Sequence, residues 1–418
     1  MSEQKSYFRT ITMSFVGNAL EFYDFTLYGV FAIKMGQEFF PTQDPLISLI
    51  ASLGAFATGF LMRPLGALLF GYLGDTYGRK TALTVSIIGI GFPTVTIGLT
   101  PGYAEIGALA PIIVIVSRLI QGLCTGGEYN GAAIYCLEQI GNTRPGFYSA
   151  FLTSSCAVGA ITATFLGGYF GGLEWEGAWR VPFILGFFIS FLGLWLRYRI
   201  EESMEFKSKA SSEKPIPLLA LLKQYKVSSI KTFGLGFLNG TMSYTVFGFL
   251  TIFLTRYGNI PEGVNIVFIN MIGLTFFMIG NPLMGHIYDR VGERRYILIM
   301  TLIHFTLPFI AFKILSSESL WLVYLAQALL GITAGAIGGI THAISQTLFP
   351  TLIRYRGIAF NFSLGMGLGG GAVGIAHLYL IESTGMIFIP SIYIICVAAA
   401  VYVLFRIAGD KKPNPYRA

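Results

Sequence analysis

Residues 71–80 read Gly-Tyr-Leu-Gly-Asp-Thr-Tyr-Gly-Arg-Lys and stand between two long apolar stretches. A second version, residues 285–295, reads Gly-His-Ile-Tyr-Asp-Arg-Val-Gly-Glu-Arg-Arg and follows half a chain length later. Glycines allow a tight turn and a close approach of two helices, and basic residues prefer the cytoplasmic side of a membrane. The Asp of each copy can pair with a basic side chain or accept backbone N–H groups at the start of a helix. Both stretches therefore predict short cytoplasmic loops between membrane helices.

The composition supports a membrane protein. Of the 418 residues 54% are hydrophobic and 12% are charged, and the mean hydropathy is +0.67. Soluble domains average about 25% charged residues. The net charge of +7 would suit nucleic acid, but most Lys and Arg residues fall in segments that we expect to be cytoplasmic. Membrane topology therefore explains the charge, and we expect no nucleic-acid partner.

Polar breaks separate twelve apolar segments, each near or above the roughly 20 residues that span a bilayer. A segment alone in lipid must satisfy its backbone internally, so all twelve are expected to be helices. The sequence thus predicts an all-α integral membrane protein with twelve transmembrane helices. They are expected at about residues 13–40, 47–74, 81–100, 108–138, 145–171, 180–198, 228–255, 263–289, 295–315, 319–348, 357–382 and 386–408.

The polar interval of residues 199–227 divides these helices into two groups of six. Its many basic residues predict a cytoplasmic loop, which places both termini in the cytoplasm as well. We expect an N-terminal bundle over 1–198 and a C-terminal bundle over 228–418. The repeated loop motif and the pairing of Gly122 with Gly331 at a similar offset indicate an internal duplication.

Ionisable groups within the apolar segments are costly in lipid and are therefore functional candidates. In the first expected helix Glu21 and Asp24 share one face because they are three residues apart. The helical rise places Asp24, Arg63 and Glu128 about 16 Å deep, with Arg118 further toward the outer side. A carboxylate beside an Arg at this depth can act as a proton switch that frees the Arg for an anionic solute. The alternative is a permanent ion pair that only fixes helix packing.

Several motifs resemble the metabolite:proton symporter family of the major facilitator superfamily. They are residues 17–25, 63–75, 121–129, 199–203 and 349–357. The resemblance implies a fold of two six-helix bundles and uptake, with protons, of organic acids or of zwitterions such as proline and betaine. The chain departs from the family at Phe22, where Trp is usual, and at Asn130, where Gly is usual.

The candidate residues fall into three groups. Residues expected to couple protons are Glu21, Asp24 and Glu128. Residues expected to bind the substrate are Asn18, Tyr28, Arg63, Arg118, Gln121 and Tyr129. Residues expected to control gating in the two loops are Asp75, Gly78, Arg79, Asp289 and Arg290. His342 and His377 also lie in apolar segments, either as titrating groups or as packing groups, and their roles stay open.

The leading hypothesis is a proton-coupled importer of a small organic anion or zwitterion in the bacterial inner membrane, acting as a monomer within membrane lipid. The alternative is a proton-driven exporter of a drug or siderophore-like metabolite. Drug antiporters of the superfamily carry a Gly-Pro motif in the fifth helix, which residues 156–168 lack. A third hypothesis is a membrane-embedded enzyme or receptor, but the sequence shows no nucleophile constellation, nucleotide loop or metal pattern. We therefore expect no enzyme activity, cofactor or metal.

Overall fold

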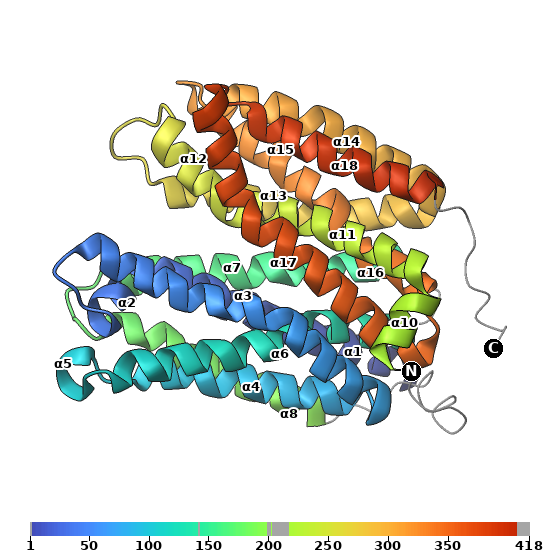
Figure 1. Cartoon of the computed structure of the whole chain (residues 1–418), viewed down its shortest axis with the longest axis horizontal. Coiled ribbons are helices and arrows are strands. Elements are labelled where there is room, and N and C mark those ends of the chain that lie inside the picture. The colour runs from blue at the N-terminus through green and yellow to red at the C-terminus, as the bar shows by residue number, and fades with distance from the viewer. Residues whose placement is uncertain (1, 141–142, 199–201, 203–216, 408–418) are drawn as a thin grey trace. The chain divides into compact units, whose positions relative to one another are not determined.

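The computed structural model describes residues 2–140, 143–198, 202 and 217–407, and the side chains among them except those of 2–10 and 46. Most of the expected loop at 199–227 lies outside these residues. All regular elements that are described are helices (Figure 1). The first group runs α1 (Ser2–Val30), α2 (Ala32–Phe39), α3 (Pro45–Thr76), α4 (Arg79–Leu99), α5 (Tyr103–Ile106), α6 (Leu109–Ile140), α7 (Pro145–Gly171), η1 (Ala178–Arg180) and α8 (Val181–Tyr198).

The second group begins after the polar interval that the sequence analysis placed at 199–227. It runs α10 (Leu218–Gln224), α11 (Lys226–Tyr244), η2 (Thr245–Phe249), α12 (Leu250–Tyr257), α13 (Ile266–Val291), α14 (Glu293–Ile314), α15 (Leu320–Gly338), α16 (Thr341–Leu348), α17 (Thr351–Thr384) and α18 (Ile389–Ile407).

Eleven described helical segments are long and apolar enough to cross a membrane. The long helix α1 is not one of them, because Asn18, Glu21 and Asp24 lower its hydropathy. Counted with α1, the segments are consistent with the twelve helices expected. Four of the expected segments differ in the structure. The first, expected over 13–40, is divided into α1 and α2 at Phe31, and the seventh is interrupted by the π-helix η2. The segment expected at 319–348 is divided into α15 and α16, and the one expected from residue 357 begins at Thr351.

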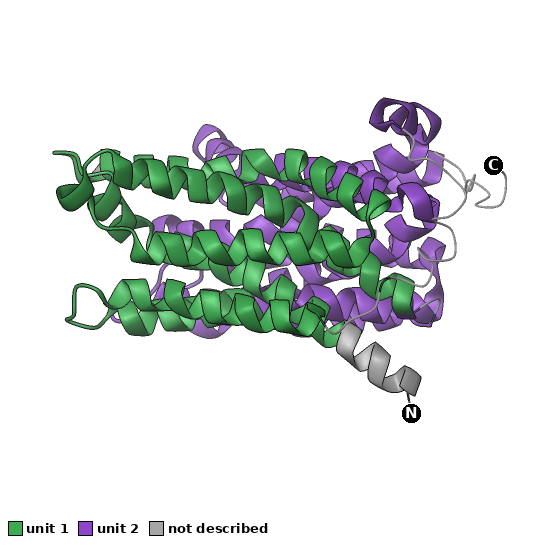
Figure 2. Cartoon of the chain, turned by 90° about the horizontal axis from the view of Figure 1, so that it is seen from below, with its two compact units in different colours: residues 1–139, 158–215 green, residues 140–157, 216–418 purple. Residues whose placement is uncertain are grey.

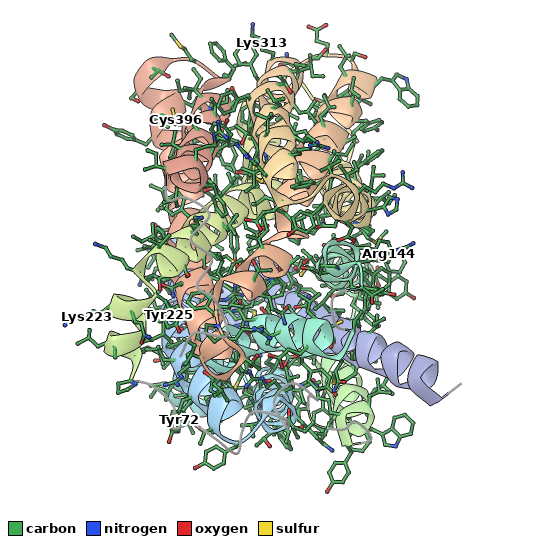
Figure 3. The ribbon with its side chains drawn as sticks, turned by 90° about the vertical axis from the view of Figure 1, so that its right-hand side faces the viewer. Tyr72, Arg144, Lys223, Tyr225, Lys313 and Cys396 are labelled. Carbon is green, nitrogen blue, oxygen red and sulfur yellow. The ribbon has the colours of Figure 1, made fainter. Side chains whose placement is uncertain are left out.

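The chain forms two compact units (Figure 2). Unit 1 comprises residues 1–139 and 158–215, and unit 2 comprises residues 140–157 and 216–418. The first part of α7 therefore packs within unit 2, although the sequence placed it in the first bundle. Many large apolar side chains on the outside of the units are exposed, as lipid-facing surfaces require. Cys396 is exposed, whereas the other three cysteines are buried (Figure 3).

Glycines bring the helices of each unit into backbone contact. In unit 1 a Cβ on Gly66 would overlap the carbonyl of Leu123, and a Cβ on Gly122 would overlap the carbonyl of Gly59. The helices α3 and α6 therefore touch without intervening side chains. In unit 2 Gly331 packs in the same way against Gly273, which joins α15 to α13.

Candidate functional site

Asp24 of α1 is the centre of a buried polar cluster in unit 1. Its Oδ2 accepts a hydrogen bond of 2.9 Å from Nη1 of Arg118, and the two form an ion pair. Its Oδ1 accepts from Thr94 Oγ1 of α4 at 2.8 Å and from Gln121 Nε2 of α6 at 2.9 Å. All four side chains are nearly fully enclosed. Two helices, α4 and α6, thus supply three donors to one carboxylate of α1.

Arg118 has N–H groups that are not used in hydrogen bonds with the described residues. Its guanidinium lies 3.9 Å above the ring centre of Tyr28, whose hydroxyl donates to the Ser52 carbonyl at 3.1 Å. Within the described residues its Nε and Nη2 have no hydrogen-bond partner. Arg118 was expected further toward the outer side than Asp24, and its guanidinium reaches the Asp24 carboxylate from α6.

Glu21 and Arg63 form a second pair on α1 and α3. Their nearest charged atoms are 3.8 Å apart, and both side chains are buried. The guanidinium of Arg63 also lies 4.3 Å from the ring centre of Phe25 and 4.9 Å from that of Phe60. Aromatic faces attract cations at these distances. The two arginines predicted to bind substrate are therefore each paired with a predicted proton-coupling carboxylate.

Glu128 has a partner that the sequence analysis missed. Arg197 of α8 donates to Oε1 of Glu128 and to the carbonyl of Leu83, while Ser86 donates to Oε2 of Glu128. Arg197 stands in the stretch Arg-Tyr-Arg at the end of α8, which reads as a cytoplasmic basic cluster. Its full enclosure shows that this Arg is instead part of the core. The need of a buried Glu128 for a cation is the signal that could have identified Arg197.

The remaining predicted binding residues surround this cluster. Asn18 lies buried on α1, and the ring of Tyr129 on α6 meets Phe22 edge-on with centres 6.3 Å apart. Phe22, which replaces the usual Trp, therefore still supplies an aromatic contact at this position.

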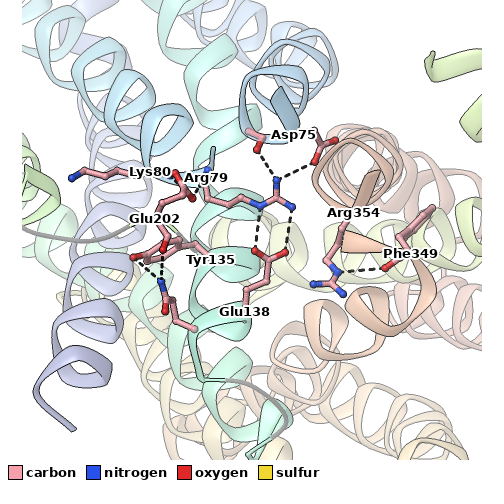
Figure 4. Close-up of polar contacts among 10 residues, drawn as sticks. Asp75, Arg79, Lys80, Tyr135, Glu138, Glu202, Phe349 and Arg354 are labelled. Carbon is pink, nitrogen blue, oxygen red and sulfur yellow. Dashed lines mark hydrogen bonds and ion pairs between the residues drawn. The ribbon is translucent and has the colours of Figure 1, made fainter. Parts of the chain in front are cut away.

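The loop motif of unit 1 forms a compact ion network around Arg79 (Figure 4). Its Nη1 donates to the carbonyl of Gly74 at 2.6 Å and to Asp75 Oδ1 at 3.3 Å. Its Nε and Nη2 donate to the two oxygens of Glu138 at 3.2 and 3.3 Å. Arg79, Asp75 and Glu138 are all buried. The three residues tie the end of α3 to the start of α4 and the end of α6.

Glu202, which follows α8, joins this network from another direction. Its carboxylate accepts from the backbone N–H groups of Arg79 at 2.8 Å and Lys80 at 3.1 Å, at the start of α4. A negative charge is favourable at a helix N-terminus. Gly78 precedes them with φ +101°, and a Cβ there would overlap the Glu202 carboxylate. Of the sequence motif at residues 199–203, only this residue is described.

In unit 2 the Asp of the second loop motif binds the N-terminus of a helix. Asp289 Oδ1 accepts from the backbone N–H of Gly146 at 2.7 Å, and Oδ2 accepts from that of Phe147 at 2.8 Å. The carboxylate thus caps α7. Arg290 is exposed in the last turn of α13. The two copies of the motif therefore use their Asp differently, one against an Arg and one against a helix N-terminus.

Comparisons with known proteins identify the family. The sequence profile of the Major Facilitator Superfamily matches residues 14–260 and 232–418. This chain belongs to the Major Facilitator Superfamily. Its relatives confirm the resemblance to the metabolite:proton symporters. The glycine betaine/proline/ectoine/pipecolic acid transporter OusA of Dickeya dadantii (strain 3937) is 31% identical over 93% of this chain and 81% of its own length. The proline/betaine transporter of Escherichia coli (strain K12) is 30% identical with the same coverage.

Solved structures show the same fold. The proton:xylose symporter XylE superposes with a TM-score of 0.76 at 14% identity and covers 97% of both chains. The human organic anion transporter MFSD10 superposes with a TM-score of 0.69 at 15% identity, covering 95% of this chain and 99% of its own. The chain is thus a multi-pass membrane transporter of the superfamily, and its relatives are transporters and not enzymes.

Proposed function

We propose that this transporter takes up a small carboxylate-bearing solute, an organic anion or a zwitterion of the proline and betaine class, together with protons. Transport proceeds by alternating access across the bacterial inner membrane, with both termini in the cytoplasm. The names of the relatives support the substrate class. The aromatic rings of Phe25, Phe60 and Tyr28 beside the arginines support a zwitterion, since such rings also attract ammonium groups.

The observation that carries the proposal is the contact of Asp24 with an Arg118 that has unused donors. A proton on Asp24 removes the negative charge that holds Nη1 of Arg118. The guanidinium, with Nε and Nη2 already unpaired, then offers a fork of N–H groups to a solute carboxylate. Departure of the solute inside the cell restores the pair once Asp24 gives up its proton. Proton and solute are thereby linked because both compete for one ion pair.

The test is transport by Asp24→Asn in proteoliposomes. The neutral amide mimics protonated Asp24, so we expect exchange of external for internal solute to continue while uphill uptake driven by a proton gradient is abolished. Glu174→Gln serves as the control, because Glu174 is exposed in the segment after α7. Uphill uptake by Asp24→Asn at the wild-type rate would remove Asp24 from the coupling role.

Arg118→Lys tests the binding half of the proposal. Lys keeps the charge but lacks the planar fork that matches a carboxylate. We expect the affinity for L-proline or glycine betaine to fall about tenfold or more, given that each 1.4 kcal/mol is a factor of ten. Ligand-induced thermal stabilisation of the purified protein measures this. An unchanged affinity would show that the solute carboxylate binds elsewhere.

A further inference from the structure

Unit 2 holds two buried amide side chains whose hydrogen-bonding groups are unused. Gln327 of α15 is fully enclosed, and neither its amide oxygen nor its amide nitrogen has a hydrogen-bond partner among the described residues. Asn270 of α13 is 7% exposed, and its Oδ1 has no partner there either. Native proteins rarely leave buried polar groups unpaired, and the exceptions call for an explanation.

The two amides belong to one locality. The side chain of Gln327 reaches over Gly273 of α13, where a Cβ would lie 2.6 Å from Gln327 Oε1. Asn270 precedes Gly273 by three residues, so its Cβ is on the same face of α13 and about 5–6 Å from that point. The two amide side chains are therefore neighbours on the face of α13 that meets α15.

The π-helix η2 lies next to Gly273 and the side chain of Gln327. A Cβ on Gly273 would also lie 3.4 Å from Cγ1 of Val246, which belongs to η2. Single π-helical turns are rare and occur frequently at functional sites. The local backbone thus departs from regular α-helix next to the two unpaired amides.

The internal repeat gives an independent reason to regard Gln327 as a binding residue. Gly331 packs on the carbonyl of Gly273 just as Gly122 packs on that of Gly59. One turn before these glycines stand Gln327 in unit 2 and Arg118 in unit 1. The position that carries the carboxylate-binding Arg in one repeat carries an unpaired neutral amide in the other.

We propose that Gln327 and Asn270 bind the N–H groups of an ammonium-bearing solute and select secondary ammonium over quaternary ammonium. This rests on the proposed uptake of a zwitterion. Two amide oxygens match the two N–H donors of an imino acid such as proline, whereas glycine betaine has no N–H to donate. A site built to hydrogen-bond an NH group rejects an analogue that lacks it, because its own polar groups are then left unpaired.

The experiment measures binding of L-proline and glycine betaine to the full chain by thermal stabilisation, for wild type and three variants. Gln327→Leu removes the amide, and Gly273→Ala displaces it while leaving it present. Thr333→Val is the matched control, because Thr333 is a buried residue of α15 whose hydroxyl already donates to the Leu329 carbonyl at 2.7 Å.

We expect Gln327→Leu to weaken proline binding about tenfold or more, the low end for loss of a buried hydrogen-bonding partner. Gly273→Ala should also weaken proline binding. The affinity for betaine should stay within about twofold of wild type in every variant, a change of less than about 0.5 kcal/mol, since about 1.4 kcal/mol corresponds to a factor of ten. If the Gln327→Leu variant lost affinity for both solutes equally, or for neither, this inference would be overturned while the proposed uptake of a zwitterion would stand. A wild-type protein that binds neither solute would overturn the zwitterion proposal and this inference with it.

Discussion

Arg197 donates a hydrogen bond to the carboxylate of Glu128, and both side chains are completely enclosed within unit 1. With Ser86 as a second donor, Glu128 has its charge compensated by two neighbouring helices. The pair thus has the features of a fixed ion pair that positions α4, α6 and α8. Among the described residues Arg197 leaves Nε without a hydrogen-bond partner, whereas the Arg partner of Asp24, Arg118, leaves both Nε and Nη2.

Breaking this pair from one side should be costly. Arg197→Leu leaves the Glu128 charge buried without a cation, which costs about 3–5 kcal/mol in comparable sites. We expect a large fall in the thermal unfolding temperature of the purified protein. The double variant Arg197→Leu/Glu128→Leu removes both charges and should recover much of the loss. A single variant as stable as wild type would show that the pair contributes nothing to packing.

Gly78→Ala should disturb the loop motif more than its counterpart does. Gly78 and Gly292 both precede a helix, with φ +101° and +80°, so Ala is strained at either position. A Cβ on Gly78 also overlaps Glu202, whereas one on Gly292 meets no atom within 4 Å. We expect Gly78→Ala to lower the unfolding temperature and the uptake rate below the values for Gly292→Ala.

Removal of Glu202 isolates the cause of that difference. In a Glu202→Ala background the overlap is gone, and Gly78→Ala should then cost no more than Gly292→Ala. If the gap between the two glycine variants persisted in this background, the overlap with Glu202 would not be its origin.

Asp289→Ala should destabilise unit 2 by uncapping α7. Loss of a side-chain cap typically costs about 0.5–2 kcal/mol, and here two backbone N–H groups, those of Gly146 and Phe147, lose their acceptor. Arg290→Ala changes the neighbouring exposed residue and should leave stability within about 0.5 kcal/mol, as is usual for surface positions. The free energies of unfolding of the two variants can be compared by chemical or thermal denaturation. Equal effects would contradict a capping role for Asp289.

His377→Phe distinguishes the two interpretations of this residue. His377 is fully buried against the rings of Phe249, Phe312 and Tyr393, and neither ring nitrogen has a hydrogen-bond partner among the described residues. As a packing group it should accept Phe with unchanged or increased stability and normal uptake. A loss of uphill uptake in a well-folded variant would instead indicate a role in transport.

The sequence predicted the helices and the buried charges better than it predicted their partners. Periodicity and the cost of charge in lipid single out Asp24, Glu21 and Arg63 without tertiary information. Which carboxylate meets which Arg depends on the rotation of each helix about its axis and on the neighbour it packs against. The contact of Arg118 on α6 with Asp24 on α1 joins two residues that are 94 positions apart in the sequence.

Other features had no local signal. The apolar stretch at 228–255 contains no residue that indicates the π-helix at Thr245–Phe249. Arg197 was not among the candidates because a basic residue at a helix end is normally solvated. Its partners, Glu128 and the Leu83 carbonyl, lie on helices far from it in the sequence.

The glycine contacts between α3 and α6 have a consequence for motion. With backbone touching backbone at Gly66, Gly122 and Gly126, neither helix can slide or roll past the other without collision. Arg63 of α3 and Arg118 of α6 therefore lie on two helices in direct backbone contact, and this packing fixes the spacing between them. The two guanidinium groups are thus already ordered in the folded protein. A solute that binds them causes little further loss of side-chain conformational entropy.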